Sequence, residues 1–146
     1  MDTMSLSYFA FTVFVLWAAH CIGDYPLQGE FLARYKAESL FVLVCHSIIY
    51  TATVMGGFYV LYATGYYLQS WNLTSFCSVS YFILLTHIMI DAVKCEYRKY
   101  LQIKYPDLND SNSTGHKYDV RGFYLDQLAH AIVLLSALFM GAIVYK

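Results

Sequence analysis

The sequence predicts an all-α integral membrane protein, a bundle of four membrane-spanning helices in one domain. Of its 146 residues, 59% are hydrophobic and only 13% are charged, which is far from the composition of a soluble domain. Charged residues are also missing from three long stretches, residues 3–23, 39–90 and 127–145. Because a spanning helix needs about 20 apolar residues, each stretch is long enough to cross a bilayer.

These stretches divide into four predicted spans. The first and last stretches each supply one, at about residues 4–23 and 122–145. The middle stretch is too long for a single helix and contains a polar run, Gln69 to Ser75, which is typical of a turn. We therefore expect two spans there, at about residues 40–66 and 76–97. The first span lacks the basic leader and small-residue cleavage site of a signal peptide, so we expect it to be retained.

Basic residues gather in the two connections on one side of the bundle, residues 24–39 and 95–121. Eight of the nine Lys and Arg residues lie in or beside these loops, and only Lys146 lies on the other side. The positive-inside rule then predicts cytoplasmic loops and outward-facing termini in the inner (cytoplasmic) membrane. Pro26 can start a short helix in the first loop, where helically spaced apolar residues favour an interfacial position. The polar residues 106–115 of the second loop are expected to be solvated chain.

Charge and cysteine content exclude other classes of function. The net charge of −1 gives no reason to propose a nucleic-acid partner. Basic residues next to the spans would instead face anionic headgroups, so we expect membrane lipid as the partner. The four cysteines show no paired spacing, so neither a disulfide framework nor a zinc ribbon is indicated. The sequence gives no oligomeric state.

Three pairs of ionisable residues recur at one spacing inside the spans. Each pair is a histidine and an aspartate at i and i+4, which places both side chains on one face of a helix. The pairs are His20 and Asp24, His87 and Asp91, and Asp126 and His130. Because an ionisable residue in a span costs about 2.5–3.5 kcal/mol on insertion scales, each of them calls for an explanation. His46 adds a histidine from the remaining helix.

These residues are also expected at a similar depth in the membrane. Chain direction alternates between spans, so the four histidines are all expected near the cytoplasmic side. One histidine on each of four facing helices is a recurrent way to build a buried metal site. The candidate metal ligands are His20, Asp24, His46, His87, Asp91, Asp126 and His130. They suffice for one metal with hydrogen-bonded neighbours, or for a two-metal centre.

Further polar residues extend the same helix faces. Gln28 and Gln127 could orient a ligand or donate to a substrate oxygen, and Lys94 could anchor the membrane edge or neutralise an anionic substrate. Simpler interpretations exist: His46 alone could be a helix-to-helix hydrogen-bonding residue, and Asp24 an interfacial cap. They do not explain three pairs with one spacing at one depth, which favours a functional cluster.

The same residues carry a family resemblance. In order along the chain stand His20-Cys-Ile-Gly-Asp24-Tyr-Pro-Leu-Gln28, then His46, then His87-Ile-Met-Ile-Asp91-Ala-Val-Lys94, then Asp126-Gln127-Leu-Ala-His130. This series resembles the bacterial and phage membrane proteins grouped as domain of unknown function 3307, over nearly the whole chain. The resemblance implies a fold more than an activity. That family is in turn distantly similar to inner-membrane proteins described as metal-dependent hydrolases, which is an analogy.

Three functions remain open. The first is a metal-dependent hydrolase at the cytoplasmic interface, in which a divalent metal, zinc first among them, activates water. Asp91 or Asp126 would be the general base, and Lys94 would face the negative charge of a lipid-linked or phosphoester substrate. The second is a metal-ion or proton carrier. In the outer half of the spans, however, the sequence offers no ionisable residue that would continue a path across the membrane. The third is a small membrane partner protein whose polar cluster only fixes helix packing.

Overall fold

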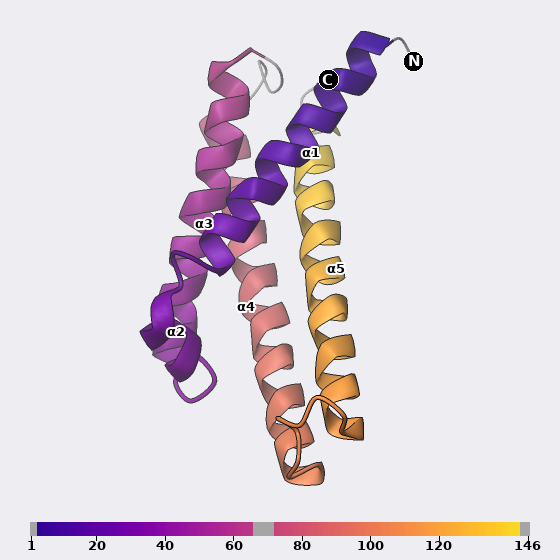
Figure 1. The fold of residues 1–146 in the computed structure, drawn as a ribbon. Helices are drawn as coiled ribbons and strands as arrows, with labels where there is room; N and C mark the ends of the chain where they lie inside the picture. The colour runs from indigo at the N-terminus through magenta and orange to yellow at the C-terminus, as the bar shows by residue number, and fades with distance from the viewer. Residues whose placement is uncertain (1–2, 66–71, 144–146) are drawn as a thin grey trace.

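The computed structural model describes residues 3–65 and 72–143, and these residues form helices without any strand. The helices are α1 (Thr3–Asp24), α2 (Gly29–Tyr35), α3 (Leu40–Ala63), α4 (Leu73–Lys104) and α5 (Thr114–Ile143) (Figure 1). The predicted all-α fold is therefore confirmed. Asn72 caps α4, because its side chain accepts from the Ser75 backbone while the Ser75 hydroxyl accepts from the Asn72 backbone. Residues 69–71 of the polar run predicted as a turn, and the ends of two predicted spans, at residues 66 and 144–145, lie outside the described residues. The rest of that run caps and begins α4, which starts at Leu73.

Four of the helices, α1, α3, α4 and α5, are long and apolar enough to cross a membrane. Their outer faces carry large apolar side chains, and among these Phe41 is 76% exposed, Phe14 68% and Met89 67%. Apolar surface on this scale is unfavourable in water and suits the hydrocarbon of a bilayer. The chain is thus a membrane protein with four transmembrane helices, as its sequence predicts.

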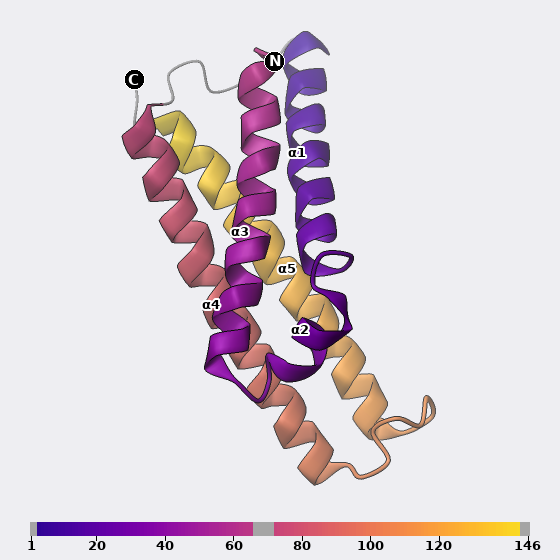
Figure 2. The same cartoon turned by 90° about the vertical axis from the view of Figure 1, so that its left-hand side faces the viewer.

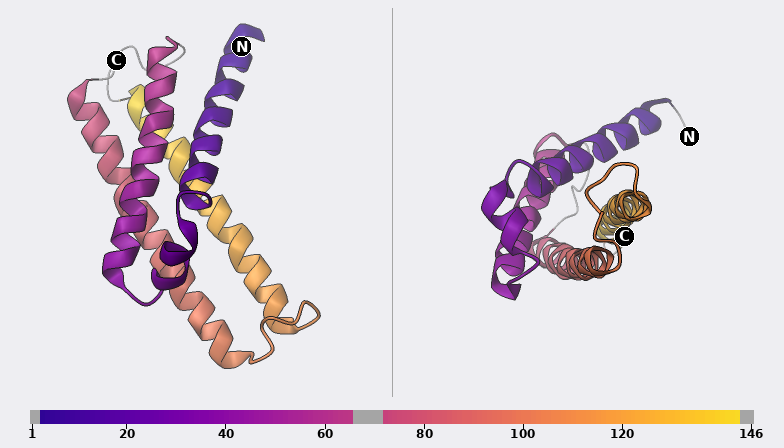
Figure 3. Two further views of the ribbon diagram at one scale, coloured as in Figure 1. Left: turned by 60° about the vertical axis from the view of Figure 1, so that its left-hand side comes forward. Right: turned by 60° about the horizontal axis from the view of Figure 1, so that its bottom comes forward.

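The four long helices pack in sequence order, α1 along α3, α3 against α4, and α4 against α5. α1 also touches α5. It is inclined to α5 in the view of Figure 1 and lies beside α3 in that of Figure 2. α2 lies outside the bundle beside α3, and none of its residues is buried (Figure 3). This confirms the short helix predicted in the first loop. Gly29 begins it at a φ of +59°, a conformation that other residues rarely adopt.

α4 and α5 are longer than the spans predicted for them. They form a hairpin that extends past α2 at the lower end of the bundle (Figures 1 and 2). The connection expected over residues 95–121 is therefore mostly helical, and only residues 105–113 join the two helices. The expectation of solvated chain at residues 106–115 is wrong in part, because Leu108 and Ser113 are buried there.

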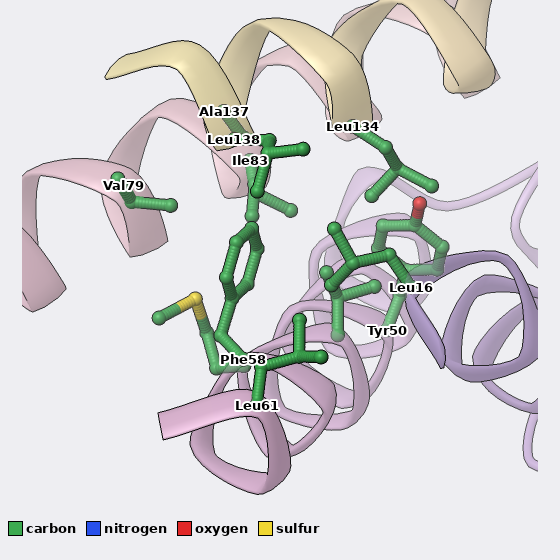
Figure 4. Close-up of a cluster of buried hydrophobic side chains, with 11 residues drawn as sticks. Leu16, Tyr50, Phe58, Leu61, Val79, Ile83, Leu134, Ala137 and Leu138 are labelled. Atoms are coloured by element: carbon green, nitrogen blue, oxygen red, sulfur yellow. The ribbon is translucent and has the colours of Figure 1, made fainter. Parts of the chain in front are cut away.

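The upper half of the bundle holds the apolar core. Side chains from α1, α3, α4 and α5 converge there around Phe58 and Tyr50 (Figure 4). α1 approaches α3 closely at Gly57, where an added Cβ would lie 3.0 Å from the Cβ of Ala19. Among the residues that the structure describes, no Asp, Glu, Lys or Arg belongs to this core. The ionisable side chains of the bundle interior lie below it.

Candidate metal centre

The seven predicted ligands meet in one buried cluster built by four helices. α1 supplies His20 and Asp24, α3 supplies one histidine, and α4 and α5 each supply a histidine and an aspartate. All seven side chains are between 0% and 5% exposed, namely those of His20, Asp24, His46, His87, Asp91, Asp126 and His130. The i,i+4 spacing therefore does place each pair on an inward face, as the sequence predicts.

Four of these residues form the larger of two groups: Asp24, His46, His87 and Asp91. The Nε2 atom of His46 lies 3.1 Å from Nε2 of His87. The same atom lies 3.4 Å from Oδ1 of Asp24 and 3.3 Å from Oδ2 of Asp91. One ligand atom from each residue falls within 4.8 Å of all the others. Two imidazole nitrogens and two carboxylate oxygens thus face one small volume.

A second group consists of Asp91, Asp126 and His130 and shares Asp91 with the first. Its ligand atoms also lie within 4.8 Å of one another. Because one carboxylate belongs to both groups, the two groups adjoin at Asp91.

The ring orientations of the α4 and α5 histidines are fixed by a chain of hydrogen bonds. Nδ1 of His130 donates to the Asp126 backbone carbonyl at 2.9 Å, which leaves Nε2 of the neutral ring as an acceptor. That nitrogen accepts from Nδ1 of His87 at 2.8 Å. Nε2 of His87 therefore presents its lone pair to the first group. Such outer contacts commonly fix the tautomer of a metal-binding histidine.

Tyr50 supports the same histidine from one side. Its ring stacks on that of His87 with centroids 3.7 Å apart and planes 9° apart. Its hydroxyl lies 3.0 Å from Nδ1 of His20. The amide nitrogen of Gln127 donates to Asp126 at 3.0 Å. The amide oxygen of Gln127 therefore points toward His20 and accepts from Nε2 of that histidine at 3.1 Å. Tyr50 must then donate to His20.

His20 is the one predicted ligand outside both groups. Both its ring nitrogens already contact protein atoms, and its ring lies 5.0 Å from that of His130 between centroids. In this arrangement it links α1 to α3 and α5 rather than facing the space shared by the other histidines. Gln127, predicted to orient a ligand or a substrate, orients His20.

Two lysines enter the cluster from its lower side. Nζ of Lys94 lies 2.5 Å from Oδ2 of Asp126, so this residue pairs with a predicted ligand. Nζ of Lys36 lies 2.7 Å from Oδ2 of Asp91 and 3.5 Å from Nε2 of His46. Gln28 joins them in the amide orientation that satisfies its neighbours, accepting from Lys36 at 2.9 Å and donating to the Asp24 carbonyl at 2.6 Å.

Several buried atoms of the cluster have no hydrogen-bond partner. They are Oδ1 of Asp24, Asp91 and Asp126, together with Nδ1 of His46. Leaving such atoms unpaired in a buried site is costly. Three carboxylates face only two ammonium groups, so with neutral imidazoles the cluster carries a formal charge of −1. A donor set of imidazole nitrogen and carboxylate oxygen with surplus negative charge fits a divalent cation such as zinc.

Two residues of the site were not singled out from the sequence, Lys36 and Tyr50. Tyr50 follows His46 by four residues, so the spacing that identified the His/Asp pairs also marked this position. Lys36 was counted only among the basic residues of the first loop. No sequence pattern distinguishes it from its neighbour Arg34, because its contact with Asp91 depends on how the chain returns after α2.

Comparison with known proteins identifies one family. The sequence model of the family described as "Protein of unknown function (DUF3307)" matches residues 12–145. The match includes all seven residues of the cluster. Neither a curated protein nor a solved structure matches the chain.

Proposed function

Since this chain belongs to the DUF3307 family, described only as proteins of unknown function, we propose its function from the buried cluster: a membrane-embedded, metal-dependent hydrolase. The substrate class that we propose is a lipid-linked molecule or phosphoester at the membrane interface. One observation carries the proposal. Two ligand groups share Asp91, and a carboxylate oxygen of each aspartate in them is buried without a partner.

In this proposal Asp24, His46, His87 and Asp91 hold the first cation. Asp126 adds a carboxylate oxygen beside Asp91 in the second ligand group, whereas His130, whose two ring nitrogens are both hydrogen-bonded, would orient His87. When bound there, a divalent ion supplies Lewis acidity that activates water for attack on an ester. The carboxylates provide the negative charge that such an ion requires, and the hydrogen-bond chain from His130 keeps His87 in the ligating tautomer.

Asp126 is the better placed general base of the two predicted candidates. Asp91 is held by Lys36, His46 and His87 and is fully buried. Asp126 is also held, by Lys94, Gln127 and His130, but it is 5% exposed at the edge of the cluster. A base there can accept the proton of an attacking water. Lys94 is 31% exposed, so its ammonium can contact both Asp126 and the negative charge of an entering substrate. The basic loops favour the cytoplasmic side for this reaction.

A proton carrier is the second candidate, and one observation favours it. The rings of His46, His87 and His130 form an unbroken chain with N···N distances of 3.1 and 2.8 Å. Such a chain can pass protons between neighbours. It runs across the bundle from α3 to α5, however, and among the described residues the apolar core above it contains no Asp, Glu, Lys, Arg or His to continue the path. We therefore favour the hydrolase.

The test is elemental analysis of the detergent-purified protein, followed by activity on labelled phospholipids. We expect bound divalent metal in stoichiometric amount, lost in His87→Gln and Asp91→Asn. His116→Gln is the matched control, because His116 lies outside both ligand groups. Metal that is present equally in all variants, or in none, would contradict the metal site. Bound metal without any lipid hydrolysis would support the metal site and contradict the proposed hydrolase activity.

A further inference from the structure

A groove runs between α4 and α5 on the outside of the bundle. Its wider part has a volume of about 520 Å³ and is lined mainly by apolar side chains, among them Met89, Val93, Leu125 and Ala129. Val93 is 70% exposed and Leu125 66%, so this part opens toward the lipid rather than into the core. Its shape and lining suit a hydrocarbon chain.

The groove continues into a smaller polar part toward the hairpin end. That part has a volume of about 230 Å³ and is lined by Lys94, Tyr97, Arg98, Asp119, Gly122 and Phe123. Three residues, Lys94, Tyr97 and Gly122, line both parts. A Cβ at Gly122, where they join, would lie 2.8 Å from the Tyr97 ring, so a larger residue there would force that ring to shift. Apolar lining thus gives way to charged lining along one continuous surface.

The charged groups of the polar part are only partly satisfied by one another. Arg98 is 59% exposed, and its Nε lies 3.6 Å from Oδ1 of Asp119, which is longer than a hydrogen bond. Lys94 contacts Asp126 through one of its three N–H donors. A phosphate between the two basic groups could accept from both, and the planar guanidinium favours bidentate contact.

The groove also reaches the buried cluster. Asp126 lines the apolar part and belongs to the second ligand group. It is only 5% exposed, and its Oδ1 atom has no hydrogen-bond partner. A lipid with its hydrocarbon chain beside Met89 and Ala129 would therefore place its headgroup between Lys94 and Arg98, next to Asp126.

We propose that this groove binds a membrane lipid with an anionic phosphate headgroup, its chain between α4 and α5 and its phosphate at Lys94 and Arg98. The binding itself does not depend on the hydrolase proposal. A role of this lipid as the substrate rests on the hydrolase proposal, because hydrolysis requires the neighbouring ligand groups. Bulk lipid would cover the apolar part in any case, so headgroup selection is the property that distinguishes a site.

Native mass spectrometry of the full-length protein tests this with two probe lipids that have identical chains, dioleoylphosphatidylglycerol and dioleoylphosphatidylcholine. We expect the protein to retain the anionic lipid in about fivefold preference, as one or two basic contacts allow. Arg98→Gln should reduce the preference, and Ala129→Phe, which fills the apolar part, should reduce retention of both lipids. Lys99→Gln is the matched control, because Lys99 pairs with Glu96 and does not line the groove.

Retention that is equal for the two lipids, or unchanged in both groove variants, would overturn the proposal. Metal content measured on the same samples separates this result from the proposed function. Arg98 and Ala129 lie outside the ligand groups, so both variants should keep the metal of the unmodified protein. Selective lipid retention by a protein without metal would support the groove and reject the hydrolase.

Discussion

The ammonium of Lys36 lies 2.7 Å from Oδ2 of Asp91, the carboxylate shared by both ligand groups. Lys36 follows α2 directly as its C-terminal cap. The surface helix of the first loop therefore delivers a positive charge to the centre of a buried cluster. A cation bound between Asp91 and His46 would lie next to this ammonium, since Lys36 is also 3.5 Å from Nε2 of His46.

Replacing Lys36 by methionine should separate stability from metal affinity. Without metal, Lys36→Met leaves Asp91 buried beside no ammonium, and removing one partner of a buried pair costs about 3–5 kcal/mol of unfolding free energy. In the presence of metal the same change removes a like charge from the site, so affinity should rise, by about tenfold. Thermal unfolding in detergent with chelator or zinc, together with calorimetric titration, measures both effects.

Lys99→Met serves as the control for that experiment, because Lys99 is exposed and pairs with Glu96 on the same helix. Lys99→Met should change neither the unfolding free energy nor the metal affinity measurably, as is usual for surface pairs. A Lys36→Met protein that loses metal affinity along with stability would show that the lysine organises the ligands instead of competing with a cation.

Asp24 provides a test of whether the cluster is built for a cation. Its Oδ1 atom is buried without a hydrogen-bond partner, 3.4 Å from Nε2 of His46. The two lysines of the cluster pair with Asp91 and Asp126, so the isosteric change Asp24→Asn removes a buried charge that has no paired ammonium. Without metal the variant should be as stable as the unmodified protein or more stable, by about 1 kcal/mol. Metal binding should weaken at least about tenfold. If Asp24 served only to hold helices together, the variant would instead lose stability and the loss would not depend on metal.

Sequence reasoning predicted the cluster because a period of four residues recurs at His20, His87 and Asp126. That local rule indicates which side chains share a helix face. Packing of the four faces against one another then brings these side chains into one cluster. It could not predict how far α4 and α5 continue, because residues 95–104 and 114–121 are polar helix with no apolar stretch to mark them. Nor could it place Lys36, whose position depends on the path of the loop.

The adjacent glycines of α3 test the packing of α1. A Cβ at Gly57 would lie 3.0 Å from the Cβ of Ala19, whereas a Cβ at Gly56 meets nothing within 4 Å. Gly57→Ala should therefore lower the unfolding free energy by about 1–2 kcal/mol, the usual cost of overpacking. Gly56→Ala should be neutral or raise it by up to about 1 kcal/mol through helix propensity. Equal effects at the two positions in thermal unfolding would contradict the described contact between α1 and α3.

The orientation in the membrane stays a prediction from the distribution of basic residues, and cysteine labelling can test it. Asn112 is exposed in the connection between α4 and α5, and Asn72 is exposed at the start of α4, at the other end of that helix. In a background with the four native cysteines replaced by serine, a membrane-impermeant maleimide added to intact cells should label Asn72→Cys and leave Asn112→Cys unlabelled. Disrupted cells should show both labelled, which controls for reactivity. The opposite pattern would place the basic loops outside, against the positive-inside rule, and would move the proposed reaction to the outer leaflet.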